Sequence, residues 1–138
     1  MTTPDLRETP HVHGFHHLAI QVADLVRGEA FYGELLGLRA IARWADEAGR
    51  PRSIWLGLPG GGFLALERSE GTPEPRPFRD GRPGLHLLAL GIRRDDRAAL
   101  EERLAAAGHP KVAETAYTFY VLDPEGNRVG LSHYPEPR

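Results

Sequence analysis

The sequence predicts an α+β fold made of two consecutive βαβββ repeats. The same order of a strand, a helix and three strands occurs twice along the 138 residues, over about 15–70 and 84–134. The two segments are of similar length, and a Pro/Gly-rich linker from Gly71 to Gly84 separates them. We therefore expect one domain over residues 14–138, preceded by a flexible tail of residues 1–13.

The first repeat opens with a strand in which hydrophobic and other side chains alternate. Leu18, Ile20 and Val22 fall on one face of this strand, and His17, Ala19 and Gln21 fall on the other. Asp24 is a suitable N-cap for a helix that runs to about Leu36, and Gly37 supplies its C-terminal stop. Three strands are then predicted near residues 39–44, 53–58 and 63–67, with a glycine turn at 60–62 before the last.

The second repeat follows the same order. A strand is predicted over Leu85–Ile92, and then a helix, capped by Asp95 or Asp96, that ends at Gly108. The predicted buried stripe of this helix consists of Ala99, Leu100, Leu104 and Ala107. Three strands are expected near residues 112–115, 118–122 and 128–133, and Asp123–Asn127 form a tight turn between the last two.

Composition excludes several classes of function. The 17 Lys and Arg residues and 19 Asp and Glu residues give a net charge of -2, and they are scattered, so no nucleic-acid partner is indicated. The chain has no cysteine, which leaves His, Asp and Glu as the candidate metal ligands. The polar start and the lack of any run of about 18 apolar residues predict a cytoplasmic protein that does not enter a membrane.

Three stretches carry a resemblance to a known family: FHHLAIQVADLVRGEAFYGELLGL from Phe15, GLHLLALGI from Gly84 and TFYVLDPEGNRVGL from Thr118. Together they resemble the vicinal-oxygen-chelate superfamily, which includes glyoxalases, bleomycin-resistance proteins and extradiol dioxygenases. The resemblance implies that the two βαβββ repeats form a curved, open mixed sheet around a cleft for a divalent ion and a small molecule. It also implies a homodimer.

The resemblance identifies His17 and His86 as metal ligands, suited to Fe, Mn, Zn or Ni. The family's third ligand, a Glu in the last strand, is Gly130 here, and the corresponding position of the first repeat is Ala65. Glu67 lies two residues beyond Ala65, on the same strand face, and is the candidate replacement. Whether the chain holds one such ion or none remains open at this point.

Other side chains are candidates for contact with a bound molecule. Tyr120 and Thr118 share a strand face, and Trp55 and Phe63 offer rings for stacking on a planar ligand. With Gln21 and Leu88 they make up the predicted ligand-binding set. Tyr120 could equally be a buried structural residue, and large aromatics such as Trp55 and Phe63 often belong to a core. Tyr120 and Glu67 are the candidate catalytic residues. Asn127 and Arg128 are interpreted as structural parts of the turn.

Two functional hypotheses follow from the resemblance. The first is a metal-free protein that binds a small molecule in the cleft, and the Gly at position 130 and the Ala at position 65 favour it. The alternative is a metal-dependent lyase, isomerase or extradiol dioxygenase, which the presence of both His17 and His86 favours. A partner chain in a dimer could also donate the carboxylate that this chain lacks.

Overall fold

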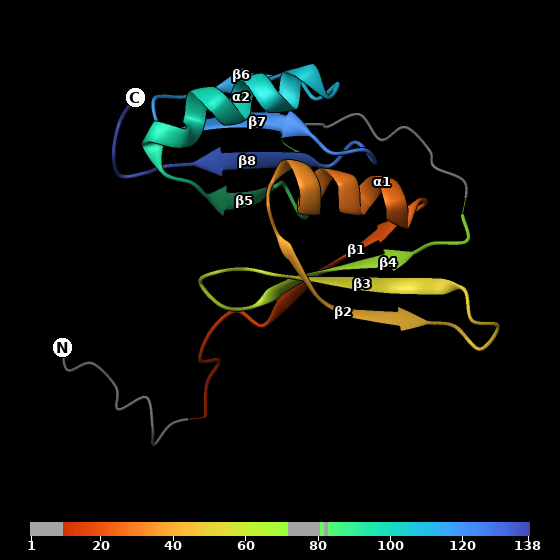
Figure 1. Ribbon diagram of the computed structural model, residues 1–138. Helices are drawn as coiled ribbons and strands as arrows, with labels where there is room; N and C mark the ends of the chain where they lie inside the picture. Colours follow the sequence, from red (N-terminus) through yellow and green to blue (C-terminus); the bar gives the residue numbers. More distant parts are fainter. Residues whose placement is uncertain (1–9, 72–80, 82) are drawn as a thin grey trace.

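The computed structural model describes residues 10–71, 81 and 83–138, which form two four-stranded sheets, one from each repeat (Figure 1). Residues 1–9 of the predicted tail, and residues 72–80 and 82 of the predicted linker, lie outside the described residues. The strands are β1 (His17–Val22), β2 (Arg39–Ala45), β3 (Pro51–Gly57), β4 (Phe63–Arg68), β5 (Leu88–Gly91), β6 (Ala113–Glu114), β7 (Thr118–Leu122) and β8 (Arg128–Ser132).

Both sheets have the same topology, which confirms the predicted duplication. The strand orders are β1-β4-β3-β2 and β5-β8-β7-β6. In each sheet the first strand pairs in parallel with the last, and the other pairs are antiparallel. The sheets are therefore mixed, and β1 and β5 are edge strands.

The first helix begins where the sequence predicts and has an unpredicted second half. The side chain of Asp24 caps α1 (Leu25–Glu29) by accepting hydrogen bonds from the amides of Val26 and Arg27 at 2.9 and 3.2 Å. The helix continues as a π-helical segment, η1 (Ala30–Leu35), and Gly37 ends it at a φ of +81°. The wider turn places Phe31 and Tyr32, both buried, side by side in the core.

Two predictions for the second helix, its N-cap and part of its buried stripe, are wrong. Its first turn is a 3-10 helix, η2 (Arg94–Asp96), which leads into α2 (Arg97–Ala106). Asp96 occupies the N-cap position but makes no side-chain cap, because its carboxylate accepts a hydrogen bond from Nε of Arg93 instead. Ala99 and Ala107 of the predicted buried stripe are exposed, whereas Leu100 and Leu104 are buried as predicted.

The strand that contains Leu88 is shorter than predicted. The sequence predicts a strand over residues 85–92, but β5 spans only Leu88–Gly91. As an edge strand β5 pairs only with β8, and their pairing starts with Leu88 beside Val129. His86 therefore lies in the segment that precedes β5 and not on a strand face. The predicted strand at 112–115 is likewise reduced to the two residues of β6.

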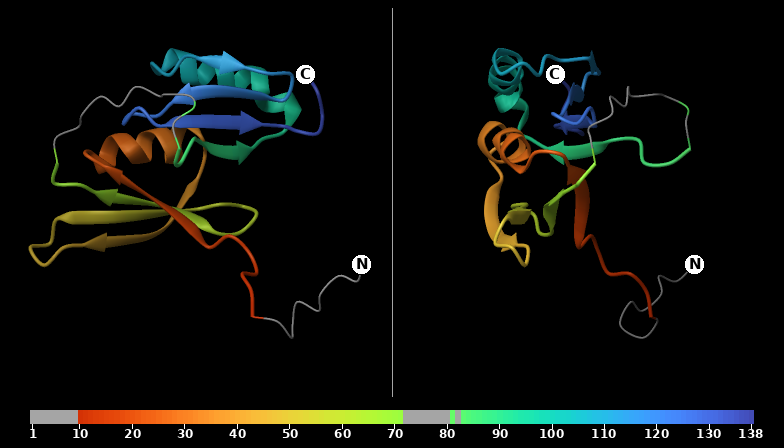
Figure 2. Two further views of the ribbon diagram at one scale, coloured as in Figure 1. Left: turned by 180° about the vertical axis from the view of Figure 1, so that it is seen from behind. Right: turned by 90° about the vertical axis from the view of Figure 1, so that its right-hand side faces the viewer.

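A single hydrophobic core joins the two repeats. Its buried side chains come from both, among them Phe31 and Leu66 of the first and Phe119 and Leu131 of the second. The two helices lie on the same side of the molecule, and α1 packs on β3 and β4 (Figure 2). Among the residues that the structure describes, no helix has the length and hydropathy needed to cross a bilayer.

A buried polar joint supplements this core. The hydroxyl of Tyr32, in η1, donates a hydrogen bond to Oδ2 of Asp123 at 2.6 Å, and both residues are less than 5% exposed. The same carboxylate accepts hydrogen bonds from the amides of Glu125 and Asn127 and from the Asn127 side chain. Burial and the charge of Asp123 raise the pKa of Tyr32, so its hydroxyl stays protonated as the donor.

A second hydrogen bond connects the same turn to the first repeat. The backbone amide of Ala23, just after β1, donates to Oε1 of Glu125 at 2.9 Å. The turn at residues 123–127 forms as predicted, with Gly126 at a φ of +86°. The turn of the second repeat is thus attached to both the helix and the first strand of the first repeat.

Changing Tyr32 to Phe should lower the free energy of unfolding by about 1.5–3 kcal/mol, because Asp123 would lose a donor in a buried environment. The measurement is urea denaturation followed by circular dichroism. The matched control is Tyr134→Phe, at a residue that is 73% exposed, and its effect should stay within about 0.5 kcal/mol. Equal effects of the two changes would refute the role given to the Tyr32 hydroxyl.

Candidate functional site

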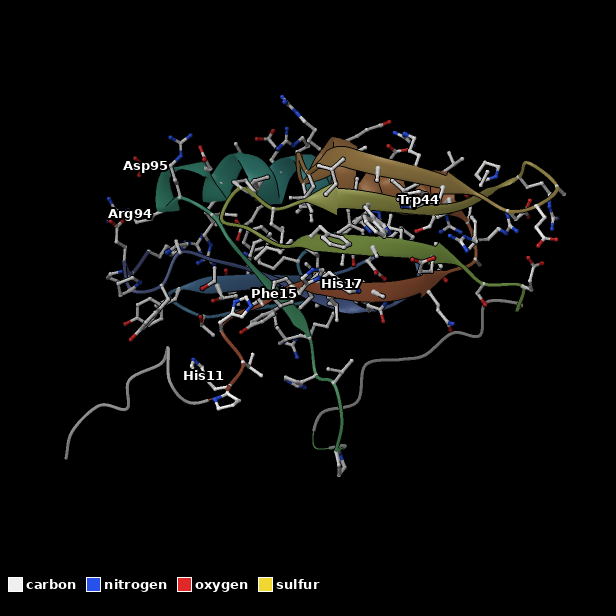
Figure 3. The ribbon with its side chains drawn as sticks, turned by 90° about the horizontal axis from the view of Figure 1, so that it is seen from below. His11, Phe15, His17, Trp44, Arg94 and Asp95 are labelled. Carbon is white, nitrogen blue, oxygen red and sulfur yellow. The ribbon has the colours of Figure 1, made fainter. Side chains whose placement is uncertain are left out.

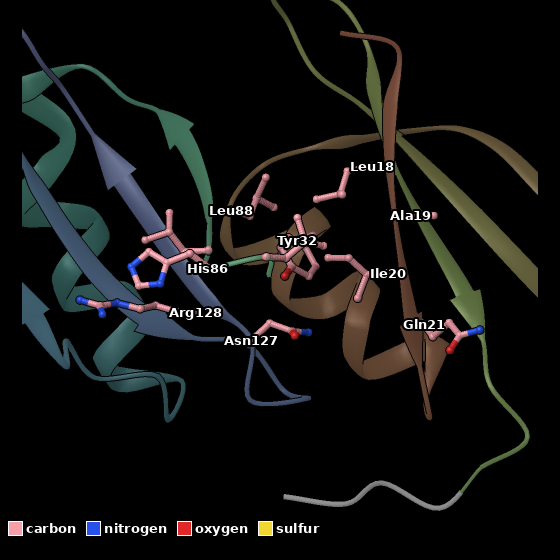
Figure 4. A pocket seen from close by; sticks show the side chains of 11 residues that line it. Leu18, Ala19, Ile20, Gln21, Tyr32, His86, Leu88, Asn127 and Arg128 are labelled. Carbon is pink, nitrogen blue, oxygen red and sulfur yellow. The ribbon is translucent and has the colours of Figure 1, made fainter. Parts of the chain in front are cut away.

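A groove of about 490 Å³ lies at the seam between the two repeats (Figure 4). We call it the seam groove. Its size is within the range of sites that bind small organic molecules. It is lined by residues from β1, from η1, from the start of β5 and the segment before it, and from the start of β8 and the turn before it, namely Leu18, Ala19, Ile20, Gln21, Tyr32, Leu85, His86, Leu87, Leu88, Asn127 and Arg128.

The lining of the seam groove combines an apolar wall with hydrogen-bond donors. The apolar part comes from β1 and from the three leucines at positions 85, 87 and 88. The donors are the side chains of Gln21, His86, Asn127 and Arg128. Gln21 and Leu88 were predicted from the sequence to contact a ligand, and they lie here on opposite repeats.

The outer face of the first sheet carries a row of aromatic rings (Figure 3). His17 stacks on Phe63 with ring centroids 4.7 Å apart, and Phe63 stacks on Trp55 at 4.5 Å. Trp44 meets Trp55 edge-on at 5.3 Å and is 45% exposed. The row thus crosses all four strands of the sheet, and it includes both rings that the sequence suggested for stacking.

The two histidines predicted as metal ligands occupy different surroundings. His17 lies in the aromatic row, and its Nδ1 is 2.8 Å from Nδ1 of His16. His86 lines the seam groove, and His17 is not among the described residues that do so. Across the described residues, no group of three or more His, Asp or Glu side chains is arranged to hold a metal ion.

The strand register also separates Glu67 from His17. In the parallel pair of β1 and β4, His17 lies beside Phe63, and Glu67 lies beside Gln21. Four residues along a strand correspond to about 13 Å. Oε1 of Glu67 accepts a hydrogen bond from Oγ of Ser53 at 2.9 Å. Ala65, which lies on β4 between Phe63 and Glu67, is 2% exposed.

The position of the family's missing carboxylate is filled by a neighbouring ring. A Cβ atom at Gly130 would lie 3.1 and 3.2 Å from two ring carbons of Tyr120 and 3.3 Å from Cγ2 of Thr118. Tyr120 and Thr118 therefore share the face of Gly130, as predicted. The Thr118 hydroxyl donates to Oγ of Ser132 at 2.8 Å, so it is engaged within the sheet.

The side chain of Arg128 packs on the ring of Tyr120. Its guanidinium carbon lies 4.2 Å from the centroid of Tyr120, within the range of a cation–π interaction. The sequence predicts a structural role for Arg128 and Asn127 in the turn, yet both line the seam groove, as does Tyr32. The spacing in the sequence could have indicated that Arg128 lies near the predicted ligand site, because Arg128 and Gly130 are two residues apart on β8 and so share a face.

Within the part of the chain that the structure describes, these contacts do not fit a two-His, one-carboxylate metal centre. The carboxylate position is a glycine under the Tyr120 ring, the nearest replacement is engaged by Ser53, and His17 and His86 have separate surroundings. What the arrangement does provide is an apolar groove with a cationic side chain and several neutral donors at its wall.

Paired βαβββ repeats with a groove at their seam define a class of small proteins, and comparison identifies the family. The sequence model of the glyoxalase/bleomycin resistance protein/dioxygenase superfamily matches residues 14–131. The chain belongs to this superfamily, as its resemblance to the vicinal-oxygen-chelate proteins predicted. A search of the curated proteins gives no match.

Solved structures share the fold. A glyoxylase/bleomycin resistance protein/dioxygenase domain from Frankia sp. EAN1pec is 25% identical, with a TM-score of 0.69 over 93% of this chain and 100% of that one. A glyoxalase/dioxygenase from Nostoc punctiforme has a TM-score of 0.74 at 20% identity, covering 90% and 92%. The fosfomycin resistance protein FosX from Listeria monocytogenes, complexed with Mn(II) and sulfate ion, has a TM-score of 0.70 at 17% identity, covering 89% and 93%.

Changing Gly130 to Ala should destabilise the fold by about 1–3 kcal/mol, because the added methyl group would press on the Tyr120 ring and on Thr118. Chemical denaturation measures the effect. Gly91→Ala is the matched control, since this glycine lies on the neighbouring strand and no other atom comes within 4 Å of an added Cβ. A Gly130→Ala protein as stable as the Gly91→Ala protein would show that the Tyr120 ring is not held against the strand.

Proposed function

We propose that this protein binds a small organic molecule in the seam groove and that it does so without a metal ion held by its own two histidines. The observation that carries the proposal is the groove itself, whose volume of about 490 Å³ and mixed lining suit a small ligand. Membership of a superfamily that includes bleomycin resistance proteins supports it.

The packing around Gly130 supports the metal-free part of the proposal. A site that had simply lost its Glu would leave a space at that position, whereas here the Tyr120 ring occupies it. Two neutral imidazoles without an anionic partner hold a divalent ion weakly. The Ser53 hydroxyl bound to Glu67 further argues against that carboxylate as the substitute ligand.

The metal content of the purified protein distinguishes metal-free binding from the alternative of a metal-dependent enzyme. Protein purified without a tag or chelator should contain no stoichiometric metal, and titration with Fe, Mn, Zn and Ni should give no binding tighter than about millimolar, a free energy near 4 kcal/mol. Metal content is measured by mass spectrometry, and affinity by calorimetry.

The contrary result would be a near-stoichiometric ion that disappears when His17 and His86 are both changed to Ala. His109→Ala/His133→Ala is the control, since neither residue lines the seam groove or belongs to the aromatic row. That result would restore the metal-dependent lyase, isomerase or dioxygenase as the leading function, and a third metal ligand besides the two histidines would then have to be found.

We also propose that the chain forms a homodimer. The aromatic row exposes His17 and Trp44 on a sheet face that no helix of the described chain covers, and Phe15 beside it is 59% exposed. Apolar surface of this kind commonly marks an interface. A partner chain on this face would bury the rings.

Light scattering coupled to gel filtration should give about twice the chain mass of 15.3 kDa. Trp44→Lys should shift the protein towards the monomer, because a charge would be placed in the contact. Arg52→Glu, on an exposed position of β3, is the control and should leave the mass unchanged. A wild-type protein of single-chain mass at all concentrations would exclude the dimer.

A further inference from the structure

We infer that the ligand of the seam groove presents a hydrogen-bond donor, an N–H or O–H group, to the side-chain oxygen of Asn127 and rests an apolar body on β1 and Leu88. This inference rests on the proposed binding function and names the chemical class of the ligand. It makes Asp123, which is buried and does not line the groove, a positioning residue for Asn127.

A buried carboxylate fixes the orientation of the Asn127 amide, which carries both donors and an acceptor. Nδ2 of Asn127 donates a hydrogen bond to Oδ2 of Asp123 at 3.0 Å. An ionised carboxylate has no proton to donate, so this contact requires the nitrogen of the amide, and not its oxygen, to lie toward Asp123. Oδ1 of Asn127 therefore lies on the other side of the amide group, where it can only accept a hydrogen bond.

The contacts around Asp123 keep the amide in this orientation. Oδ1 of Asp123 accepts hydrogen bonds from the backbone amides of Glu125 and Asn127 at 2.9 and 2.8 Å, and Oδ2 accepts one from the Tyr32 hydroxyl at 2.6 Å. Turning the Asn127 amide over would bring its oxygen against Oδ2 of Asp123 and remove a donor from a buried carboxylate. The acceptor is thus oriented before a ligand arrives, which lowers the entropic cost of binding.

The oriented amide belongs to the groove wall. Asn127 is exposed and lines the seam groove, and Figure 4 shows its side chain extending from the wall of the second repeat toward the side on which Ile20 lies. Across the described part of the chain, no N–H or O–H group of the protein hydrogen-bonds to Oδ1 of Asn127. A ligand without a donor would displace water from this oxygen and would not replace its hydrogen bond.

The apolar body of the ligand has a matching surface. Leu18 and Ile20 of β1 and Leu88 of β5 are half-buried and line the groove from the two repeats (Figure 4). Half-buried leucine and isoleucine side chains gain from being covered by an apolar group. A wholly polar molecule would leave this surface in water, so the geometry favours an organic molecule with an apolar body and a donor group.

The test is a titration of the full chain, labelled with ¹⁵N, with two pairs of neutral compounds: benzamide with N,N-dimethylbenzamide, and benzyl alcohol with benzyl methyl ether. Within each pair, methylation removes the donor and keeps the aromatic body. Benzamide and benzyl alcohol should shift the amide signals of Ile20 and Leu88 at about three- to tenfold lower concentrations than their methylated partners. The affinities of benzamide and benzyl alcohol, compared with each other, decide between an N–H and an O–H donor.

Two variants separate the hydrogen bond from the size of the compounds and from the stability of the turn. Asn127→Ala removes the acceptor, so each methylated compound should then bind as well as its partner. Glu125→Ala is the matched control, because it removes the hydrogen bond between the turn and the Ala23 amide, keeps the Asn127 side chain, and changes a residue that does not line the groove. It should keep the preference for donors. Circular dichroism verifies that each variant is folded.

Methylated compounds that bind the wild type as well as their partners do would overturn the inference, and so would a preference for donors that persists in Asn127→Ala. In both cases the shifts at the groove would still support the proposed function. No shift of groove signals with any of the four compounds would overturn the inference and would also count against the groove as a ligand site.

Discussion

The hydrogen bond between Tyr32 and Asp123 is the contact on which the relation between the two repeats depends. A buried carboxylate is costly unless it is fully paired, and Asp123 meets this condition only with a donor from the other repeat. The same carboxylate shapes the turn that ends at Asn127. The two walls of the seam groove, one from each repeat, are thus held together by this polar joint and by the Ala23–Glu125 hydrogen bond, inside a common core.

The glycine at position 130 affects the packing of two neighbouring strands, β7 and β8. Without a side chain there, the Tyr120 ring of β7 lies over β8 and supports the guanidinium of Arg128 at the groove. A family member with Glu at this position would place an anion where this chain places an aromatic ring and, beside it, an organic cation. This packing is consistent with the proposed metal-free binding function, because no carboxylate stands at the family's metal-ligand position.

Local patterns account for the parts of the fold that the sequence predicted. The Asp24 cap, the stop at Gly37 and the turn at residues 123–127 depend on neighbours in the chain, and all three are observed. The predictions that were wrong depended on competing partners, one of them close in the chain and one on another strand. Asp96 gives its carboxylate to Arg93 rather than to the helix, and the strand over residues 85–92 shrinks to β5 because an edge strand pairs only with β8.

By itself the sequence determined the two repeats, their strand and helix order, and the face on which most side chains lie, because hydrophobic period and turn residues are local properties. Only the tertiary structure decided the register, which sets Glu67 beside Gln21 and not near His17. It also decided that residues as distant in the chain as Ile20, His86 and Arg128 line one groove. An alternating pattern of side chains predicts which face of a strand each residue occupies. It does not predict the register of that strand against its neighbour, or how two sheets pack together. Both follow from the shared core and its buried polar joint.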